Sequence, residues 1–160
     1  PLSRSFYLAW NGKLNDVEDD FMRYIRGAGQ EIVSQSYTAV GKQSSFLSLK
    51  PKGKITVTGS TSVGPLLECL AEEYMKLNPK AVITVKQTDS SDGIRQTMQG
   101  KCNFGMSSRD LKDNEKEILD YESIARDEIA VIVNKENPLE DISMEQLENG
   151  RSCMTDENTE

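Results

Sequence analysis

The sequence contains no histidine, which removes the side chain that most often serves as a general base or metal ligand. Nucleophiles that depend on a Ser-His or Cys-His pair are excluded with it. Three cysteines, Cys69, Cys102 and Cys153, stand far apart, without the Cys-x-x-Cys spacing typical of zinc sites. An odd number also argues against a closed disulfide framework. We therefore expect no enzyme, no metal and no cofactor, and we expect Cys69 to be a buried thiol on the apolar side of a helix.

Long apolar runs and an excess of positive charge are also missing. No run approaches the roughly 18 residues of a membrane-spanning helix, and no signal peptide is visible. The net charge of −7 gives no basic footprint for nucleic acid. The phosphate-cradling motifs of nucleotide enzymes, G-x-x-x-x-G-K-[ST] and G-x-G-x-x-G, do not occur. What remains is typical of one globular domain, with 36% hydrophobic and 28% charged residues in a length of 160.

The apolar pattern predicts strands that alternate with helices. A first strand is expected at 5–10, followed by a helix over 16–35 that Asp16 caps and that Gly27 and Gly29 interrupt. Beyond a serine-, lysine- and glycine-rich linker, the expected strands are 54–58, 82–86, 103–106 and 127–134, and the expected helices are 62–77, 90–99 and 112–119. This alternation predicts an α/β fold with an open, mostly parallel sheet covered by helices on both faces.

Clusters of hydroxyl side chains follow three of the expected strands. They are "GSTS" at 59–62, "DSSDG" at 89–93 and "MSSRD" at 106–110. In an open α/β sheet, the loops at the carboxyl ends of the strands lie on one edge, where ligands bind. Each cluster also opens a helix and offers unpaired N–H groups at the positive end of the helix dipole. Together the clusters suit a small oxyanion, to which Arg109 could add a bidentate contact.

Helix capping explains any single cluster equally well. Ser and Thr are favoured N-caps, and Asp-Ser-Ser-Asp-Gly is common turn chemistry. Under this interpretation Ser62 caps the helix over 62–77, and Arg109 forms a weak surface pair with Asp110 or Asp113. Because three clusters lie on one sheet edge, we consider two explanations equally strong: anion binding, and helix capping without any ligand.

The motifs "GSTS", "NP", "SSDGI", "G…FGMSSR" and "IARDEIAVIVN", between residues 54 and 147, carry a specific resemblance. They resemble the start of the phosphate-binding proteins that serve ABC phosphate importers, in the form common in Gram-positive bacteria. The resemblance implies one lobe of a type 2 periplasmic binding protein. Many members have an aspartate at the place of Ser108, where it accepts a proton from the ligand. By resemblance, the residues that hold phosphate are Ser60, Thr61, Ser62, Ser90, Ser91, Ser107 and Ser108.

Residues 1–40 resemble the end of the same family, where the chain recrosses the hinge between two lobes. The end therefore precedes the beginning, joined by the linker 41–53. Because Pro1 is not methionine, the chain is expected to be an excised piece or a mature product, and the simplest account is the junction of two modules in tandem. Residues 1–40 and 54–147 are expected to fold together as one permuted lobe, with the strand 5–10 beside 127–134. Residues 148–160 are expected to form a flexible tail.

The resemblance implies an extracellular or periplasmic solute-binding component of a phosphate uptake system, with about half of the oxyanion site in this chain. Its partners would be inorganic phosphate and the membrane subunits of the importer, and a lipid anchor would hold the parent protein at the membrane. Two alternatives stay open. One is a receptor for sulfate, molybdate or tungstate, because such sites also use helix N-termini and hydroxyls. The other is a protein-interaction domain that kept the fold and lost the ligand.

Overall fold

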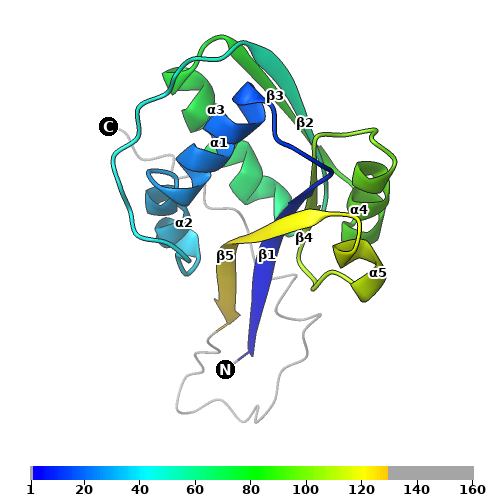
Figure 1. The fold of residues 1–160 in the computed structure, drawn as a ribbon. Coiled ribbons are helices and arrows are strands. Elements are labelled where there is room, and N and C mark those ends of the chain that lie inside the picture. Colours follow the sequence, from blue (N-terminus) through cyan, green and yellow to red (C-terminus); the bar gives the residue numbers. More distant parts are fainter. Residues whose placement is uncertain (1, 130–160) are drawn as a thin grey trace, which may run out of the picture. The chain divides into compact units, whose positions relative to one another are not determined.

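The computed structural model describes residues 2–129, in which a five-stranded sheet carries helices on both faces (Figure 1). The strands are β1 (Leu2–Trp10), β2 (Gly53–Gly59), β3 (Ala81–Gln87), β4 (Phe104–Ser107) and β5 (Asp120–Ile129). The helices are α1 (Asp16–Arg26), α2 (Gln30–Ser36), α3 (Gly64–Leu77), α4 (Ser90–Met98) and α5 (Asp113–Lys116). The expected tail at 148–160 lies outside the described residues.

The strand order in the sheet is β3-β2-β4-β1-β5. β2 pairs in parallel with both neighbours, so that Val57 lies opposite Val85 on β3 and opposite Phe104 on β4. β1 is antiparallel to β4 on one side and to β5 on the other. Four strands therefore run in one direction and β1 in the other, which confirms the expected α/β fold with an open, mostly parallel sheet.

The first strand lies beside the strand that contains residues 127–129, as expected, but residues 5–10 pair with residues 120–126 and only the earlier residues of β1 pair with 127–129. Ser3 lies opposite Glu128 and Arg4 opposite Asp127. The partner strand is longer than expected, however, because β5 begins at Asp120 and not at residue 127. Its largely polar first part, "DYESIAR", forms a strand because it pairs with residues 5–10 of β1, and such pairing overrides local propensity. Residues 130–134 lie outside the described part of the chain.

The larger core lies between one sheet face and the helices α1, α2 and α3, while α4 and α5 cover the opposite face (Figure 1). β1 shows the separation, because Phe6 and Leu8 point into the larger core and Ala9 into the smaller one. The smaller core also contains Ile94 and Leu111. Both sheet faces are therefore covered, as the alternating pattern predicted.

The helix ends agree with the sequence in outline and differ in detail. Asn15, not Asp16, is the N-cap of α1: its Oδ1 accepts from the N–H of Glu18 at 2.9 Å, and Glu18 Oε1 accepts from the Asn15 N–H at 3.0 Å. This reciprocal pair is a capping box, and the side chain of Asn15 satisfies an N–H group that the helix leaves open. The expected interruption is confirmed, because α1 ends at Arg26 and α2 begins at Gln30.

Two further expectations differ from the structure: the length of the helix over 112–119 and the burial of Cys69. The helix expected over 112–119 is limited to the single turn of α5. Cys69 is exposed, although it was expected to be a buried thiol. The buried stripe of α3 runs through Leu67, Leu70 and Tyr74, and Cys69 lies beside this stripe. Within residues 2–129, no helix is both long and apolar enough to cross a membrane.

The linker contains no helix or strand, but side chains fasten it to the helices. We call residues 41–52 the strap. Asp20 of α1, 1% exposed, accepts hydrogen bonds from Ser48 Oγ and from the hydroxyl of Tyr74, both at 2.7 Å. The ring of Phe46 packs against that of Tyr74, with centroids 6.3 Å apart. A carboxylate inside the core therefore joins the strap to α1 and α3.

Candidate functional site

The loops that follow β2, β3 and β4 meet at one sheet edge, and one serine from each contributes to a common cluster. Ser108 Oγ lies 3.1 Å from Ser60 Oγ and 3.4 Å from Ser90 Oγ. Ser90 Oγ also accepts a hydrogen bond of 3.1 Å from the backbone N–H of Ser108. We call Ser60, Ser90 and Ser108 the serine cluster. Topology brings its members together, because parallel strands place their carboxyl ends on the same edge.

Backbone hydrogen bonds between the loops hold the cluster in place. The N–H of Ser60 donates to the carbonyl oxygen of Met106 at 3.0 Å, and the N–H of Thr88 donates to that of Gly59 at 2.7 Å. Gly93, in the first turns of α4, lies directly against the backbone of Thr58 and Gly59. Because these contacts involve backbone atoms, the relative positions of the three loops are fixed by the sheet itself.

Ser60, and not Ser62, provides the side-chain cap at the start of α3. Ser60 Oγ accepts from the N–H groups of Ser62 at 3.2 Å and Val63 at 3.4 Å. Val63, the formal N-cap, makes no capping bond through its side chain. The expectation for Ser62 was wrong because residues 61–63 form a turn, so that the helix begins later, at Gly64. Thr61 is exposed and Ser62 half-buried at the rim.

Substitution of Ser60 by alanine is expected to lower the free energy of unfolding by about 1 kcal/mol, since two N–H groups lose their acceptor. Ser62→Ala is the matched control and is expected to cost less than about 0.5 kcal/mol, because its side chain caps nothing. Urea unfolding followed by circular dichroism measures both variants. Equal losses in the two would contradict the assignment of the cap to Ser60.

At α4, capping and the serine hydroxyls are separated. Asp89 is the cap, because its Oδ1 accepts from the N–H of Asp92 at 2.7 Å. The hydroxyl of Ser90 is therefore left for the serine cluster, and that of Ser91 accepts from Arg109 Nη2 at 3.3 Å. At this helix, capping alone does not explain the serines.

Ser107 is placed differently from the other candidate residues. Its side chain is fully buried, its Oγ donates to the Arg109 carbonyl oxygen at 2.7 Å, and the N–H of Arg109 donates back at 3.2 Å. The structure thus does not bring this hydroxyl into the serine cluster. It shapes the turn that presents the next residue, Ser108.

Arg109 lies beside the serine cluster, but its guanidinium is already engaged by a carboxylate. Nη1 and Nη2 donate to the two oxygens of Glu115 at 2.8 and 3.1 Å. The hydrogen bonds from Arg109 hold the pKa of Glu115 below its ordinary value, against the opposing effect of burial. The expected surface pair with Asp110 or Asp113 is therefore wrong: Asp110 accepts from the Tyr7 hydroxyl at 2.9 Å instead.

Glu115 is the residue that sequence reasoning missed. It lies in α5, where Oε1 also accepts from the N–H of Lys112 at 2.8 Å, so the carboxylate is fixed from two sides. A buried glutamate six residues after an arginine is too weak a signal to be recognised in the sequence. Its consequence is that Arg109 brings little net positive charge to the serine cluster.

A shallow pocket of about 300 Å³ adjoins the serine cluster. Its wall consists of two segments. Residues 3–5 belong to β1, and residues 108–110 belong to the loop after β4. Arg4 forms an ion pair of 3.2 Å with Asp127. Within residues 2–129, no group of three or more His, Cys, Asp or Glu side chains could hold a metal ion. The arrangement offers neutral hydrogen-bond donors, which suit binding better than acid-base chemistry.

Comparison with known proteins gives consistent matches. A family model described as a PBP superfamily domain matches residues 34–149. The chain is 37% identical over 150 residues to the phosphate-binding protein PstS 2 of Streptococcus pneumoniae, covering 92% of this chain and 52% of the relative. With the protein of the same name from Streptococcus agalactiae, identity is 35%, and coverage is 91% of this chain and 51% of that relative.

A solved structure gives the same picture. The crystal structure of a phosphate-binding protein of a phosphate ABC transporter, from Streptococcus pneumoniae, superposes with a TM-score of 0.80 at 37% identity. The match covers 92% of this chain and 58% of that one. The chain thus spans about half the length of the relatives to which it is similar.

Proposed function

Because the chain belongs to the PBP superfamily, we propose that it forms part of a solute-binding protein that captures inorganic phosphate for an ABC importer. The observation that carries the proposal is the serine cluster, in which the Ser60 and Ser90 hydroxyls, from two other loops, lie within 3.4 Å of the Ser108 hydroxyl. The similarity to proteins named phosphate-binding supports the choice of ligand. We further propose an extracellular or periplasmic location, a lipid anchor on the parent protein and the membrane subunits of the importer as partners.

The chemistry of the cluster suits a tetrahedral oxyanion. Each serine hydroxyl now bonds to another hydroxyl, and rotation about its C–O bond would turn its hydrogen toward a bound oxygen. Thr61 and Ser62 follow Ser60 directly in the chain, Ser91 follows Ser90, and all three would offer further hydroxyls to the anion. Arg109 would act through its contact with Ser91 and not as an open fork. Ser107 would only support the turn.

This chain would hold about half of the site. Contacts from a second lobe, which the family resemblance implies, would close over the serine cluster from the other side. Because a similarity over 92% of this chain extends over only about half of one relative, the order of its segments fits within a single module. We therefore favour one module, with the segment order of its relatives, over the junction of two modules in tandem.

Replacing both Ser90 and Ser108 with alanine in the parent protein, which carries the second lobe, is expected to weaken phosphate binding at least 100-fold. The reason is that two hydrogen bonds to a charged ligand are lost, at about 1.5–3 kcal/mol each. Isothermal titration calorimetry with phosphate measures the effect. Residues 1–160 alone are expected to bind phosphate in the millimolar range or not at all, because half a site leaves part of the anion unsatisfied.

The matched control replaces Ser34 and Ser36, exposed serines of α2, and is expected to leave phosphate affinity unchanged. Sulfate is the second ligand to titrate, because the serine cluster contains no carboxylate that could accept the proton of phosphate. Stronger binding of sulfate than of phosphate would favour a receptor for another oxyanion. Unchanged phosphate affinity in the Ser90/Ser108 variant would contradict the proposed site. Absence of phosphate and sulfate binding to the unaltered parent protein would favour a protein-interaction domain.

A further inference from the structure

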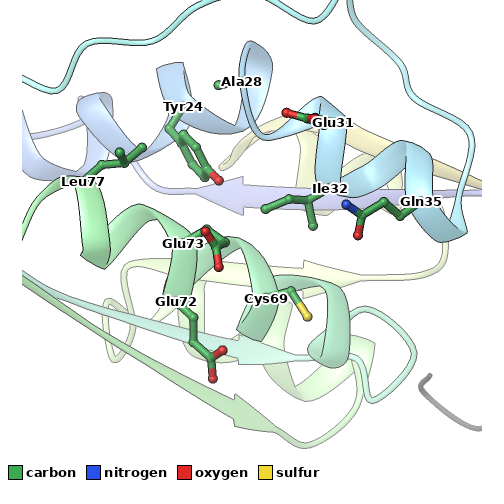
Figure 2. Close-up of a pocket in the computed structure, with 9 residues that line it drawn as sticks. All are labelled: Tyr24, Ala28, Glu31, Ile32, Gln35, Cys69, Glu72, Glu73 and Leu77. Atoms are coloured by element: carbon green, nitrogen blue, oxygen red, sulfur yellow. The ribbon is translucent and has the colours of Figure 1, made fainter. Parts of the chain in front are cut away.

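A second concave surface lies far along α3 from the serine cluster. A groove of about 480 Å³ runs between α3 on one side and the end of α1 with α2 on the other (Figure 2). In Figure 2, the side chains of Tyr24 and Ile32 reach from the upper helices toward Glu73 and Cys69 of α3. Leu77, 45% exposed, lies at one end of the groove. The serine cluster, by contrast, adjoins the N-terminal end of α3.

The two walls combine apolar and acidic side chains at helical spacing. Glu31 and Ile32 belong to α2, and Glu72, Glu73 and Leu77 belong to α3. Residues three or four positions apart lie on the same helix face, so each wall presents a continuous edge to the groove. Apolar side chains such as Ile32 and Leu77 thus lie beside glutamates of both walls, which complements a segment whose apolar side chains are flanked by positive charges.

The basic residues nearby neutralise only one of the three glutamates that line the groove, Glu73. Of the residues that line it, none is lysine or arginine. On α1, Arg23 pairs with Asp20 at 2.6 Å and Arg26 with Glu122 at 2.7 Å, so both are engaged elsewhere. On α3, Lys76 pairs with Glu73 at 2.7 Å. Glu31 and Glu72 are exposed and form no ion pair within residues 2–129, although the charge of Glu72 also acts on Lys76.

The hydroxyl of Tyr24 also lies in the electric field of the glutamates that line the groove. Its pKa is raised to about 12, first by burial and then by the charges of Glu73 and Glu31. Carboxylates from both walls thus act on a single point, although they belong to different helices. A cation placed there would interact with both walls at once.

We propose that this groove binds a cationic, amphipathic segment of a partner protein. Lysine or arginine side chains of that segment contact Glu31 and Glu72, and an apolar side chain between them packs on Ile32 and Leu77. The binding is independent of the serine cluster and of phosphate, because no residue is shared between the two surfaces.

The test uses the chain as it is and a synthetic helical peptide of lysines and leucines, with the leucines on one face. Calorimetric titration is expected to show binding that weakens as salt is added. The variant Glu31→Gln/Glu72→Gln is expected to bind this peptide at least fivefold more weakly. The matched control Glu117→Gln/Glu128→Gln removes the same amount of charge from exposed positions outside the groove and is expected to change affinity less than twofold.

Equal weakening in the two double variants would overturn the proposal, because the overall negative charge of the protein would then account for binding. Absence of peptide binding to the wild-type chain would overturn it as well. A third titration uses a peptide with glutamates in place of the lysines, for which no binding is expected. If that peptide bound, or if sedimentation showed a dimer that Glu31→Gln/Glu72→Gln disrupts, the occupant of the groove would not be a cationic segment of a partner.

Discussion

Replacement of Asp20 by asparagine is expected to release the strap and to lower the free energy of unfolding by about 3 kcal/mol. Oδ2 of Asp20 accepts from Ser48 Oγ and from the Tyr74 hydroxyl, and Oδ1 accepts from the N–H of Leu49 and from Arg23. Each carboxylate oxygen of Asp20 accepts two hydrogen bonds. In asparagine an NH2 group replaces one of these oxygens, so two of the four donors would face a donor instead of an acceptor. The site is buried, and water cannot replace the lost acceptor.

Tyr74 connects the Asp20 carboxylate to Pro51, near the end of the strap, through the side chain of Asn78. Its hydroxyl also accepts from Asn78 Nδ2 at 3.0 Å, and the same amide group donates to the carbonyl oxygen of Pro51 at 2.9 Å. Loss of the Asp20 carboxylate thus weakens the attachment of Ser48 directly and that of Pro51 through one intermediate. Chemical unfolding gives the loss in stability, and digestion with trypsin is expected to cut faster after Lys52 in the variant.

Asp19 provides the matched control, because it is the neighbouring carboxylate on the same helix. Its side chain is 55% exposed and pairs with Arg23 at 3.6 Å, so Asp19→Asn is expected to cost less than about 0.5 kcal/mol. If Asp20→Asn cost as little as Asp19→Asn, the strap would be held by the packing of Phe46 and not by the carboxylate.

The pH dependence of stability gives a separate check on the role of Asp20. Burial acts to raise the pKa of this carboxyl, but hydrogen bonds from Ser48, Tyr74 and the Leu49 N–H, together with Arg23, hold it below the ordinary 3.8. A depressed pKa means that the carboxylate stabilises the fold above the unfolded-state value, and that this contribution is lost as the pH falls through the folded-state value. The difference in stability between the wild type and Asp20→Asn is therefore expected to shrink below about pH 4.

Replacement of Gly59 by alanine is expected to cost about 4 kcal/mol and to displace Ser60. The φ angle of Gly59 is +144°, a conformation that other residues rarely adopt, and this strain alone costs about 1–3 kcal/mol. An added Cβ would lie 2.2 Å from the carbonyl oxygen of Met106, and crowding of this kind adds about 1–3 kcal/mol. The neighbouring atom belongs to β4, which can move only with the sheet.

Gly12→Ala serves as a control that separates the cost of backbone strain from the cost of steric crowding. Gly12 also has a positive φ, +79°, but nothing lies within 4 Å of the position of its added Cβ. This control is therefore expected to lose about 1 kcal/mol, from strain alone. Thermal or urea unfolding compares the variants, and in the parent protein Gly59→Ala is expected to weaken phosphate binding as well. A loss at Gly59 no larger than that at Gly12 would mean that the loop after β2 is free to adjust.

The central strands could be predicted from the sequence because each is a short apolar run that ends at a turn. β2, β3 and β4 begin and end within about two residues of the expected positions. β5 was expected too late because its first half is polar and is stabilised by pairing along β1, which no local pattern records. The cap at Asn15 in place of Asp16 is a displacement by one residue between two good capping side chains.

The convergence of the three loops could be predicted because it follows from strand direction. The direction in which each hydroxyl points could not. Ser107 and Ser108 are adjacent at the end of a strand, where successive side chains alternate, and only Ser108 contacts the other loops. The engagement of Arg109 by Glu115 depends on the short helix α5, whose length the sequence overstated.

The position of β1 in the sheet has a consequence for how the chain folds during synthesis. β1 is synthesised well before its partners, because Leu8 pairs with Met106 and Phe6 with Ala125. At about 5–20 residues per second, a ribosome needs roughly 5–25 s to make the residues between them. During that time both edges of an apolar strand lack their partners, and such edges favour aggregation. Contacts of this long sequence separation also slow folding, because a long segment must be ordered before β1 can pair.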